Sequence, residues 1–406
     1  MLVFYFFALL VIWLGVLSLR SGFGFSAYVR REIARPRQDF APFASVIAPC
    51  RGLEDGLREN IASLFQQDYS AYEIIFVTDR ADDPALGAIE EVRQSEGDEE
   101  YPVTKCLIAG PASDSGQKVH NLRAAISEID NRSEVIVFVD TDARPNSQWL
   151  ASLIAPLHDE TIGAATGYRW FVPSGGGFGG LATHLRSVWN ASIASTLGAG
   201  SDKNFCWGGS TAIRRSTFEK LGIVERWHGS VSDDFTLTRV LQEEGLPIHF
   251  VPACLVASVD HLTMKGLIEF SNRQLKITRV YASHLWKPLL IGSFLFCAVF
   301  FVGTAVVLAR AFMGLDYGVP LGLLLVIYAL GAAKAHIRLR AVALVLSDYE
   351  REIRNSWPAH LLLWPFSSLL FLCNAIAAAF SRRIKWRGIT YDLKSPTEAV
   401  IIARDE

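Results

Sequence analysis

Long uncharged segments near both ends of the chain limit what it can fold into. Residues 2–19 carry no charge, and an α-helix needs roughly 20 apolar residues to cross a bilayer. Residues 288–309 predict a second span and residues 319–333 a shorter third one. Half of the 406 residues (50%) are hydrophobic and the mean hydropathy is positive. We therefore expect an integral membrane protein with several spans.

Basic residues that follow the first apolar segment predict its orientation. The arginines after it are Arg20, Arg30, Arg31, Arg35 and Arg37. Positive charge stays on the cytosolic side of a span, so the amino terminus is expected outside and the following chain in the cytosol. The alternative is a cleaved signal peptide, but no basic residue precedes the apolar core and no small-x-small cleavage site follows. We expect the membrane to be a bacterial inner membrane.

Residues 361–380 form a further apolar segment with basic residues on both sides. Basic flanks on both sides conflict with a simple crossing. Pro365 removes a helical hydrogen bond, so one interpretation is a re-entrant hairpin or an element that lies in the interface. The alternative is a full span with an external tail.

Strands and helices alternate between the two apolar ends. Short apolar runs at residues 45–48, 73–78, 103–108 and 134–139 predict strands, and residues 57–66 and 119–129 predict helices. This alternation predicts an α/β fold with a parallel sheet and helices on both faces. The expected domains are a transmembrane helix (1–20), a cytosolic catalytic domain (40–270), an amphipathic interfacial helix (271–287), a transmembrane or interfacial region (288–380) and a basic cytosolic tail (381–406).

Composition and absent motifs exclude several functions. The net charge is -2, which does not favour binding to nucleic acid. The six cysteines form no Cys-x-x-Cys pair and predict reduced thiols without a zinc site or disulfides. Neither G-x-G-x-x-G after the first strand nor G-x-x-x-x-G-K-[ST] is present. A dinucleotide oxidoreductase and a P-loop ATPase are therefore disfavoured.

Two carboxylates follow the most apolar of the predicted strands. Asp140-Thr141-Asp142 comes directly after residues 134–139, and open α/β sheets bind ligands at the carboxyl ends of their strands. Carboxylates at this spacing suit a hard divalent cation that in turn holds phosphate oxygens. A solvated loop is the alternative interpretation. We expect Asp142 to ligate Mn²⁺ or Mg²⁺, with Asp140 as its support or as a contact to the nucleotide.

Several segments in order along the chain resemble one enzyme family. They begin at Pro49, Leu64, Tyr72, Lys118, Cys206, Ser232, Arg273 and Ile384, and read PCRGLEDGL, LFQQDY, YEIIFVTD, KVHNL, CWGGS, SDDF, RQLKI and IKWRG. Together they resemble glycosyltransferase family 2, and most of all its ceramide glucosyltransferase branch, family 21. The resemblance implies a GT-A fold, a divalent metal, a UDP-sugar donor and inversion at the anomeric carbon. It also implies that one sugar, a hexose, is moved to a lipid hydroxyl such as that of ceramide.

Two residues before the Asp140 strand are expected to contact the nucleotide. Asp79 ends the second strand and is placed to accept hydrogen bonds from the base or ribose; the alternative is a turn residue beside Asp82-Asp83-Pro84. Lys118 suits a diphosphate, or is an ordinary lysine at a helix start. Asn121 lies one helical turn further on.

Asp234 is the candidate base. Ser232 resembles an N-cap, which puts Asp233 and Asp234 in the first helical turn. Acids there also favour the helix dipole without any catalysis. The transfer, however, needs a carboxylate that takes the proton of the attacking hydroxyl, and in the family pattern the second acid does this.

Trp207, Gly208 and Gly209 are the candidate acceptor residues before the strand that starts at Thr211. The glycines allow a ligand close to the backbone, and Trp207 can stack on a sugar or lipid. A tight turn with a core tryptophan is the alternative. The run of glycines at residues 175–180 predicts a mobile loop, either a lid near the acceptor or a plain connector.

The segment around Arg273 departs from the family pattern Q-x-x-R-W. Gln274 is expected near the acceptor, but Lys276-Ile277 stands where Arg-Trp is usual. Arg273, Lys276 and Arg279 predict the basic face of an amphipathic helix that clamps the diphosphate or, alternatively, meets anionic lipid. The missing tryptophan and the few spans argue against a processive polysaccharide synthase. The third hypothesis is a non-catalytic membrane protein that binds nucleotide sugars.

Overall fold

The computed structural model describes residues 1–95, 102–173 and 180–405. The expected glycine-rich loop at 175–180 lies outside these residues, except for Gly180. The chain forms two compact units that are described separately. The helical unit comprises Met1–Arg30, Phe171–Thr196 and His261–Ser381. The sheet unit comprises Arg31–Trp170, Leu197–Asp260 and Arg382–Glu406.

The sheet unit is built on a mixed sheet that has seven strands over the described residues. Their order is β3-β2-β1-β4-β6-β5-β7. The strands are β1 (Ala44–Pro49), β2 (Tyr72–Thr78), β3 (Val103–Ile108), β4 (Val135–Phe138), β5 (Ala164–Pro173), β6 (Thr211–Arg214) and β7 (Ile248–Asp260). β1 pairs in parallel with β2 and β4, as predicted, whereas β6 runs antiparallel to β4. Apolar periodicity marks a strand but not its direction, so the sequence pattern missed the reversal.

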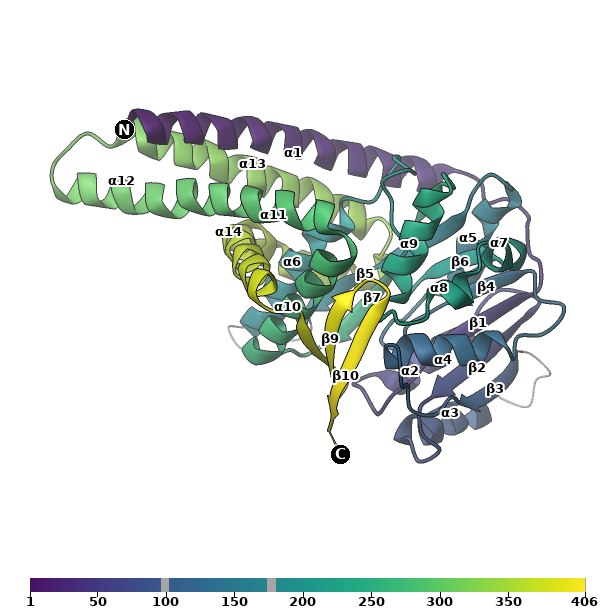
Figure 1. Cartoon of the computed structure of the whole chain (residues 1–406). Coiled ribbons are helices and arrows are strands. Elements are labelled where there is room, and N and C mark those ends of the chain that lie inside the picture. The colour runs from purple at the N-terminus through teal and green to yellow at the C-terminus, as the bar shows by residue number, and fades with distance from the viewer. Residues whose placement is uncertain (96–101, 174–179, 406) are drawn as a thin grey trace. The chain divides into compact units, whose positions relative to one another are not determined.

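One apolar core joins this sheet to helices on a single face. Its helices include α4 (Gln117–Ile126), α7 (Arg215–Lys220), α8 (Ile223–Arg226) and α9 (Asp233–Glu243). Leu122 of α4 and Val240 of α9 are fully buried in it. Figure 1 shows α4, α8 and α9 in front of the strands. The remaining helices of this unit are α2 (Leu57–Phe65), α3 (Pro84–Ser95), α5 (Trp149–Ile154) and η1 (Ala155–His158).

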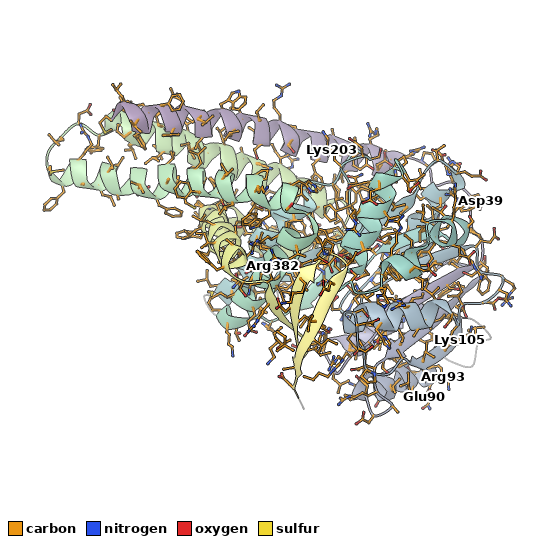
Figure 2. All side chains as sticks on the ribbon, in the orientation of Figure 1. Asp39, Glu90, Arg93, Lys105, Lys203 and Arg382 are labelled. Carbon is orange, nitrogen blue, oxygen red and sulfur yellow. The ribbon has the colours of Figure 1, made fainter. Side chains whose placement is uncertain are left out.

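Charged residues lie on the outer surface of the sheet unit. Figure 2 labels Glu90 and Arg93 on α3, which form an ion pair of 3.0 Å. Lys105 on β3 contacts the buried Glu73 carboxylate at 2.8 Å. The Glu90–Arg93 pair is exposed and belongs to the solvated rim of the sheet, where such pairs contribute little free energy.

The carboxyl-terminal tail is folded, in contrast to the expected basic tail. It forms an antiparallel sheet of β8 (Arg383–Trp386), β9 (Ile389–Ser395) and β10 (Glu398–Arg404). Ile389, Tyr391 and Leu393 alternate on the buried side of β9. This period of two is the signature of a half-buried strand. The prediction followed the basic residues and overlooked it.

The helical unit contains four helices that are long and apolar enough to cross a membrane, counted over the described residues. They are α1 (Leu2–Ala34), the continuous segment Ser283–Phe312, α13 (Gly318–Ala343) and Ser347–Phe380. The second comprises α11 (Ser283–Cys297), the π-helical turn η3 (Ala298–Val302) and α12 (Gly303–Phe312), and the fourth comprises η4 (Ser347–Tyr349) and α14 (Glu350–Phe380). Ala8, Val299 and Ile327 share one core, and Figure 1 shows α1, α11–α12 and α13 side by side. Apolar helices at both ends of the chain are thus confirmed.

The re-entrant break expected at Pro365 is wrong, because α14 is continuous through this residue. Proline removes the amide that the carbonyl of Leu361 would otherwise accept from. The Tyr328 hydroxyl of α13 donates to this carbonyl at 3.0 Å. A neighbouring helix thus satisfies the freed group, which makes proline tolerable inside an apolar helix. Figure 1 shows α14 at a steep angle to the other three helices rather than alongside them.

Over the described residues, the helical unit has two further helices. They are α6 (Leu181–Ala194) and α10 (Met264–Tyr281). Trp189 of α6, Leu275 of α10 and Ala378 of α14 share a small core. The amphipathic helix expected over 271–287 therefore begins earlier and ends at Tyr281.

Candidate functional site

The two carboxylates after β4 converge on one guanidinium. The Asp142 oxygens accept from Arg169 Nη1 and Nη2, each at 2.9 Å. Asp140 Oδ2 lies 3.2 Å from Arg169 Nη2. The central strand delivers both acids to its carboxyl end, as the sequence predicted, and β5 brings Arg169 beside them. A forked guanidinium that holds two carboxylates fixes the directions of both.

Lys118 links this pair of acids to a third carboxylate. Its Nζ lies 2.7 Å from Asp140 Oδ1 and 3.3 Å from Asp233 Oδ2. Burial alone would lower the pKa of Lys118, but the facing carboxylates outweigh it and raise that pKa above its usual value. Burial likewise favours a higher pKa for Asp140, and Lys118 and Arg169 reverse the sign and lower it. Lys118 and Asp140 therefore stabilise each other's charged forms.

The third carboxylate is fixed by the start of α9. Ser232 is the N-cap, and its hydroxyl oxygen accepts from the Phe235 amide at 3.3 Å. Asp233 is buried and Trp227 Nε1 donates to its carbonyl at 3.1 Å. Burial raises the pKa of the Asp233 carboxyl to about 6, against the opposing effect of Lys118.

Asp234 is the next residue and has a different environment. Its Oδ1 accepts from the Phe235 amide at 2.7 Å and from the Ser232 hydroxyl. The residue is only partly buried. One oxygen of the carboxylate is thus oriented by the helix start, which is the arrangement a positioned base requires.

Gly208 and Gly209, which follow Trp207, allow the backbone to lie in close contact with the charged side chains of Asp233, Lys118 and Asp140. A Cβ on Gly208 would lie 2.3 Å from Asp233 Oδ2 and 2.7 Å from Lys118 Nζ. On Gly209 it would lie 2.3 Å from the Trp207 ring. No side chain larger than hydrogen fits at either place without a shift. The two glycines therefore serve the geometry of the acidic cluster.

Trp207 covers the guanidinium of Arg169. The Arg169 Cζ lies 4.8 Å from the centre of the Trp207 ring, and Tyr168 packs edge-on to the same ring at 5.6 Å. Trp207 is buried. The tryptophan thus helps to position the cation that binds the acidic pair, a role that the sequence did not indicate.

Sequence reasoning missed Arg169. A signal was present, because Arg169 stands between Tyr168 and Trp170 in an otherwise apolar strand. A charged residue inside such a run is buried only when it has partners.

Asp79 lies at the end of β2, with Arg51 as its neighbour. Arg51 Nη1 is 3.6 Å from Asp79 Oδ2, and Asp79 Oδ1 is a buried atom without a hydrogen-bond partner among the described residues. Asp83, by contrast, accepts from the Gly52 and Ala85 amides, each at 2.9 Å. The turn-forming role that was weighed for Asp79 thus belongs to Asp83.

Asn121 is tied to the start of its own helix. The Asn121 Oδ1 accepts from the side-chain Nε2 of Gln117 at 2.9 Å. The backbone amide of Gln117 donates to the Tyr391 hydroxyl at 3.1 Å. The folded tail thus supports α4, the helix that carries Lys118.

The tail also brings an arginine that sequence reasoning missed. Arg387 has a φ of 51°, a left-handed backbone that is uncommon outside glycine. Its guanidinium lies 2.6 Å from Glu54 and donates to the carbonyl of Arg51 at 3.0 Å. The only signal was its place in the motif that begins at Ile384.

The four residues expected on the amphipathic helix are not part of the sheet unit. Arg273, Gln274, Lys276 and Arg279 lie on α10 of the helical unit. Arg279 donates to the Ala378 carbonyl and lies 5.5 Å from the Trp286 ring centre. Burial lowers the pKa of Lys276.

Asp140 and Asp142 are suited to a divalent cation. Among the described residues, no group of three or more His, Cys, Asp or Glu side chains is placed to hold a metal ion. Asp140 and Asp142 are two carboxylates that already converge on one cation, the guanidinium of Arg169. Mg²⁺ and similar ions are often held by one or two carboxylates plus phosphate oxygens and water, so the donor set fits.

A family model matches almost the whole chain. The model described as "Glycosyl transferase family 21" aligns with residues 5–399. The chain belongs to glycosyl transferase family 21. The resemblance noted in the sequence is thereby confirmed, and so is the enzyme class of a glycosyltransferase. The sheet and the long apolar helices confirm the α/β fold class with apolar helices at both ends.

The solved structures that are similar to the family 21 chain have low sequence identity to it. A mannosyltransferase from Pyrobaculum calidifontis, in complex with GDP-Man and Mn²⁺, has a TM-score of 0.47 and 18% identity and covers 92% of this chain and 98% of its own. Glucosyl-3-phosphoglycerate synthase from Mycobacterium tuberculosis, in complex with Mn²⁺ and UDP-glucose, has a TM-score of 0.38 and 15% identity and covers 63% of this chain and 82% of its own. No curated protein matches the sequence.

Proposed function

We propose that this family 21 enzyme moves one hexose from a UDP-sugar to a lipid hydroxyl with inversion at the anomeric carbon. Ceramide or a related lipid is the proposed acceptor. The observation that carries the proposal is the convergence of Asp140, Asp142, Lys118, Arg169 and the start of α9 in the sheet unit. Acidic and basic side chains from four segments that are distant in the sequence surround one point there. A protein that only binds nucleotide sugars needs no carboxylate at a helix start beside this point.

Binding of the donor follows from these charges. Asp140 and Asp142 are the proposed ligands of Mn²⁺ or Mg²⁺, which when bound supplies positive charge to the leaving diphosphate. Lys118 already faces two carboxylates and is the proposed ammonium contact to a phosphate oxygen. The unpaired Asp79 Oδ1 supports a role in accepting a hydrogen bond from the base or ribose.

Asp234 is the proposed base. The acceptor hydroxyl attacks the anomeric carbon, its proton passes to the Asp234 carboxylate, and the bond from that carbon to the UDP oxygen breaks on the opposite face. Attack opposite the leaving group inverts the configuration. The hydrogen bond from the Phe235 amide fixes one oxygen of Asp234 and supports this assignment, because a base must be oriented before it acts.

The helical unit supports a lipid acceptor. Its candidate spans are apolar, and α14 is continuous and basic at both flanks. We propose that α1, α11–α12 and α13 cross a bacterial inner membrane, that α14 lies in the interface and that the sheet unit is cytosolic. The proposed acceptor is then a lipid of the same membrane. Three crossings are too few for a polysaccharide channel.

A transfer assay tests the proposal. The full chain in lipid is given a panel of UDP-sugars with Mn²⁺ or Mg²⁺, and extracted lipids are analysed by mass spectrometry. We expect one lipid class that carries one added sugar. A ladder of polymer contradicts the single transfer, and absence of UDP release with every donor contradicts the enzyme.

The base is tested with matched variants. Asp234→Asn should lose turnover by at least a hundredfold, about the scale of general base catalysis, and still bind UDP. Asp82→Asn is the control, because that side chain is 81% exposed. If Asp233→Asn abolishes turnover and Asp234→Asn does not, the base has been assigned to the wrong acid.

A further inference from the structure

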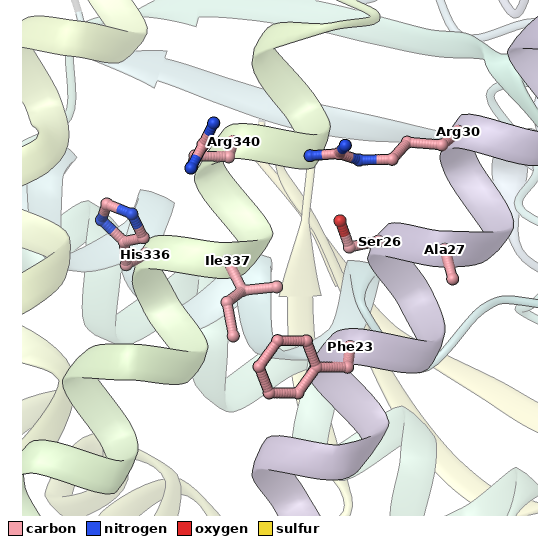
Figure 3. Close-up of a pocket in the computed structure, with 7 residues that line it drawn as sticks. All are labelled: Phe23, Ser26, Ala27, Arg30, His336, Ile337 and Arg340. Atoms are coloured by element: carbon pink, nitrogen blue, oxygen red, sulfur yellow. The ribbon is translucent and has the colours of Figure 1, made fainter.

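A cavity in the helical unit has a cationic rim and an apolar floor. Its volume is about 310 Å³. It is lined by Phe23, Ser26, Ala27 and Arg30 of α1 and by His336, Ile337 and Arg340 of α13. In Figure 3 Phe23 and Ile337 point toward one another, and Arg30 extends from α1 toward the side on which Arg340 lies. The cavity is therefore amphipathic.

In the part of the chain that the structure describes, the two arginines on the rim have no acidic partner. Arg30 and Arg340 are exposed, and within the described ranges neither forms an ion pair or a side-chain hydrogen bond. Two guanidinium groups on one rim repel each other weakly in water. An anion between them removes this repulsion and gains charge-assisted hydrogen bonds. The rim is thus complementary to a phosphate group.

The cavity lies just beyond the apolar part of both helices. Residues 2–19 and 318–333 are uncharged, and Lys334 Nζ donates to Ser18 Oγ at 2.8 Å at this border. At about 1.5 Å per residue, Phe23 and Ile337 each lie about 6 Å beyond the uncharged segments. The polar layer of a bilayer extends roughly 5–7 Å beyond the hydrocarbon core on each side. The floor is therefore at headgroup level, and the long arginine side chains reach back to it from the cytosolic edge.

We propose that this cavity binds the headgroup of an anionic phospholipid from the surrounding membrane. Arg30 and Arg340 hold the phosphodiester, and the glycerol and first acyl carbons contact Phe23 and Ile337. A lipid with a net negative charge is favoured over phosphatidylcholine, because choline brings a cation to a rim that already has two. Basic pockets between membrane helices on the cytoplasmic side are known lipid sites.

The test measures retained lipid on the full chain. The protein is purified in mild detergent, given phosphatidylglycerol or phosphatidylcholine, and analysed by native mass spectrometry. We expect one tightly held phosphatidylglycerol and no comparable phosphatidylcholine. The variant R30Q/R340Q should reduce the occupancy at least tenfold. The control R351Q/R354Q removes two exposed arginines of α14 and should leave the occupancy unchanged.

A second variant keeps the charges and removes the space. Ala27→Trp places a large ring in the cavity from an exposed position and should also expel the lipid. The proposal is overturned if both double variants lose lipid equally, if the two lipids bind equally, or if A27W retains it. Displacement by millimolar inorganic phosphate would assign the rim to a soluble anion instead. Sugar transfer is not measured, so the result is independent of the proposed function.

Discussion

Replacement of Lys118 by methionine should destabilise the sheet unit in a way that depends on pH. The ammonium lies 3.3 Å from Asp233, which has no other ion pair among the described residues. Asp140 keeps Arg169 as a second partner at 3.2 Å. Removal of one partner from a buried pair costs about 3–5 kcal/mol. We expect the lower end, about 3 kcal/mol, because only one carboxylate loses its sole cation.

Thermal unfolding of the detergent-solubilised chain measures this loss. At about 2–4 °C per kcal/mol for a unit of this size, the unfolding midpoint should fall by roughly 6–12 °C at pH 8. Lys203→Met is the matched control, because this lysine is exposed in the same unit. The double variant K118M/D233N should recover most of the loss, since it leaves no unpaired charge at that place.

The pH dependence follows from the Asp233 carboxyl. Burial raises its pKa from 3.8 to about 6 in the folded chain, and loss of Lys118 raises it further. A carboxyl whose pKa is higher in the folded than in the unfolded state stabilises the folded state fully at pH values below its unfolded-state pKa. This stabilisation is lost as the pH rises through the folded-state pKa. The deficit of the variant should therefore be largest above pH 7 and shrink below about pH 6. A deficit equal to that of K203M, or one that does not change with pH, would refute the reasoning.

Three further substitutions test the packing around the site. Gly208→Ala places a Cβ 2.3 Å from Asp233 Oδ2; we expect turnover to fall about a hundredfold, the scale of a small misplacement at the reacting centre, in the lipid transfer assay. Tyr391→Phe removes one buried hydrogen bond and should cost about 1 kcal/mol, a shift of a few degrees in thermal unfolding, and an unchanged midpoint would mean that the tail does not support α4. Gly229→Ala meets the Thr397 carbonyl at 2.0 Å from a backbone with φ 71°; we expect its unfolding midpoint to fall more than that of Tyr391→Phe, and equal stability would contradict the close approach.

Local patterns in the sequence predicted the elements near the site. The uncharged run before Asp140 reads as a buried strand because its side chains have no polar face, and β4 is indeed buried throughout. The N-cap at Ser232 follows from a short polar residue before an apolar helical stripe. Both signals depend on residues a few positions apart, so they survive without knowledge of the fold.

Some features carried a signal that was outweighed by another. The alternation of hydrophobic and polar residues in β9 is visible in the sequence of the tail. The basic residues of the same segment led instead to the prediction of a basic cytosolic tail. Pro365 correctly marked a lost amide, yet the hydroxyl that replaces it comes from Tyr328 on another helix. Without knowing that the Tyr328 hydroxyl reaches the Leu361 carbonyl, one cannot distinguish a helix that breaks at the proline from one that continues through it.

The sequence alone determined the apolar ends, the α/β alternation and the acids at two element ends, because each is set by local periodicity and capping. Only the tertiary structure decided that Arg169 clamps Asp140 and Asp142 and that Lys118 reaches Asp233. Arg169 lies 27 positions from Asp142 and 29 from Asp140, and Lys118 lies 115 positions from Asp233. No local pattern encodes which distant charges meet. The raised pKa of Asp233 likewise depends on burial, which is a property of the folded chain and not of the residue itself.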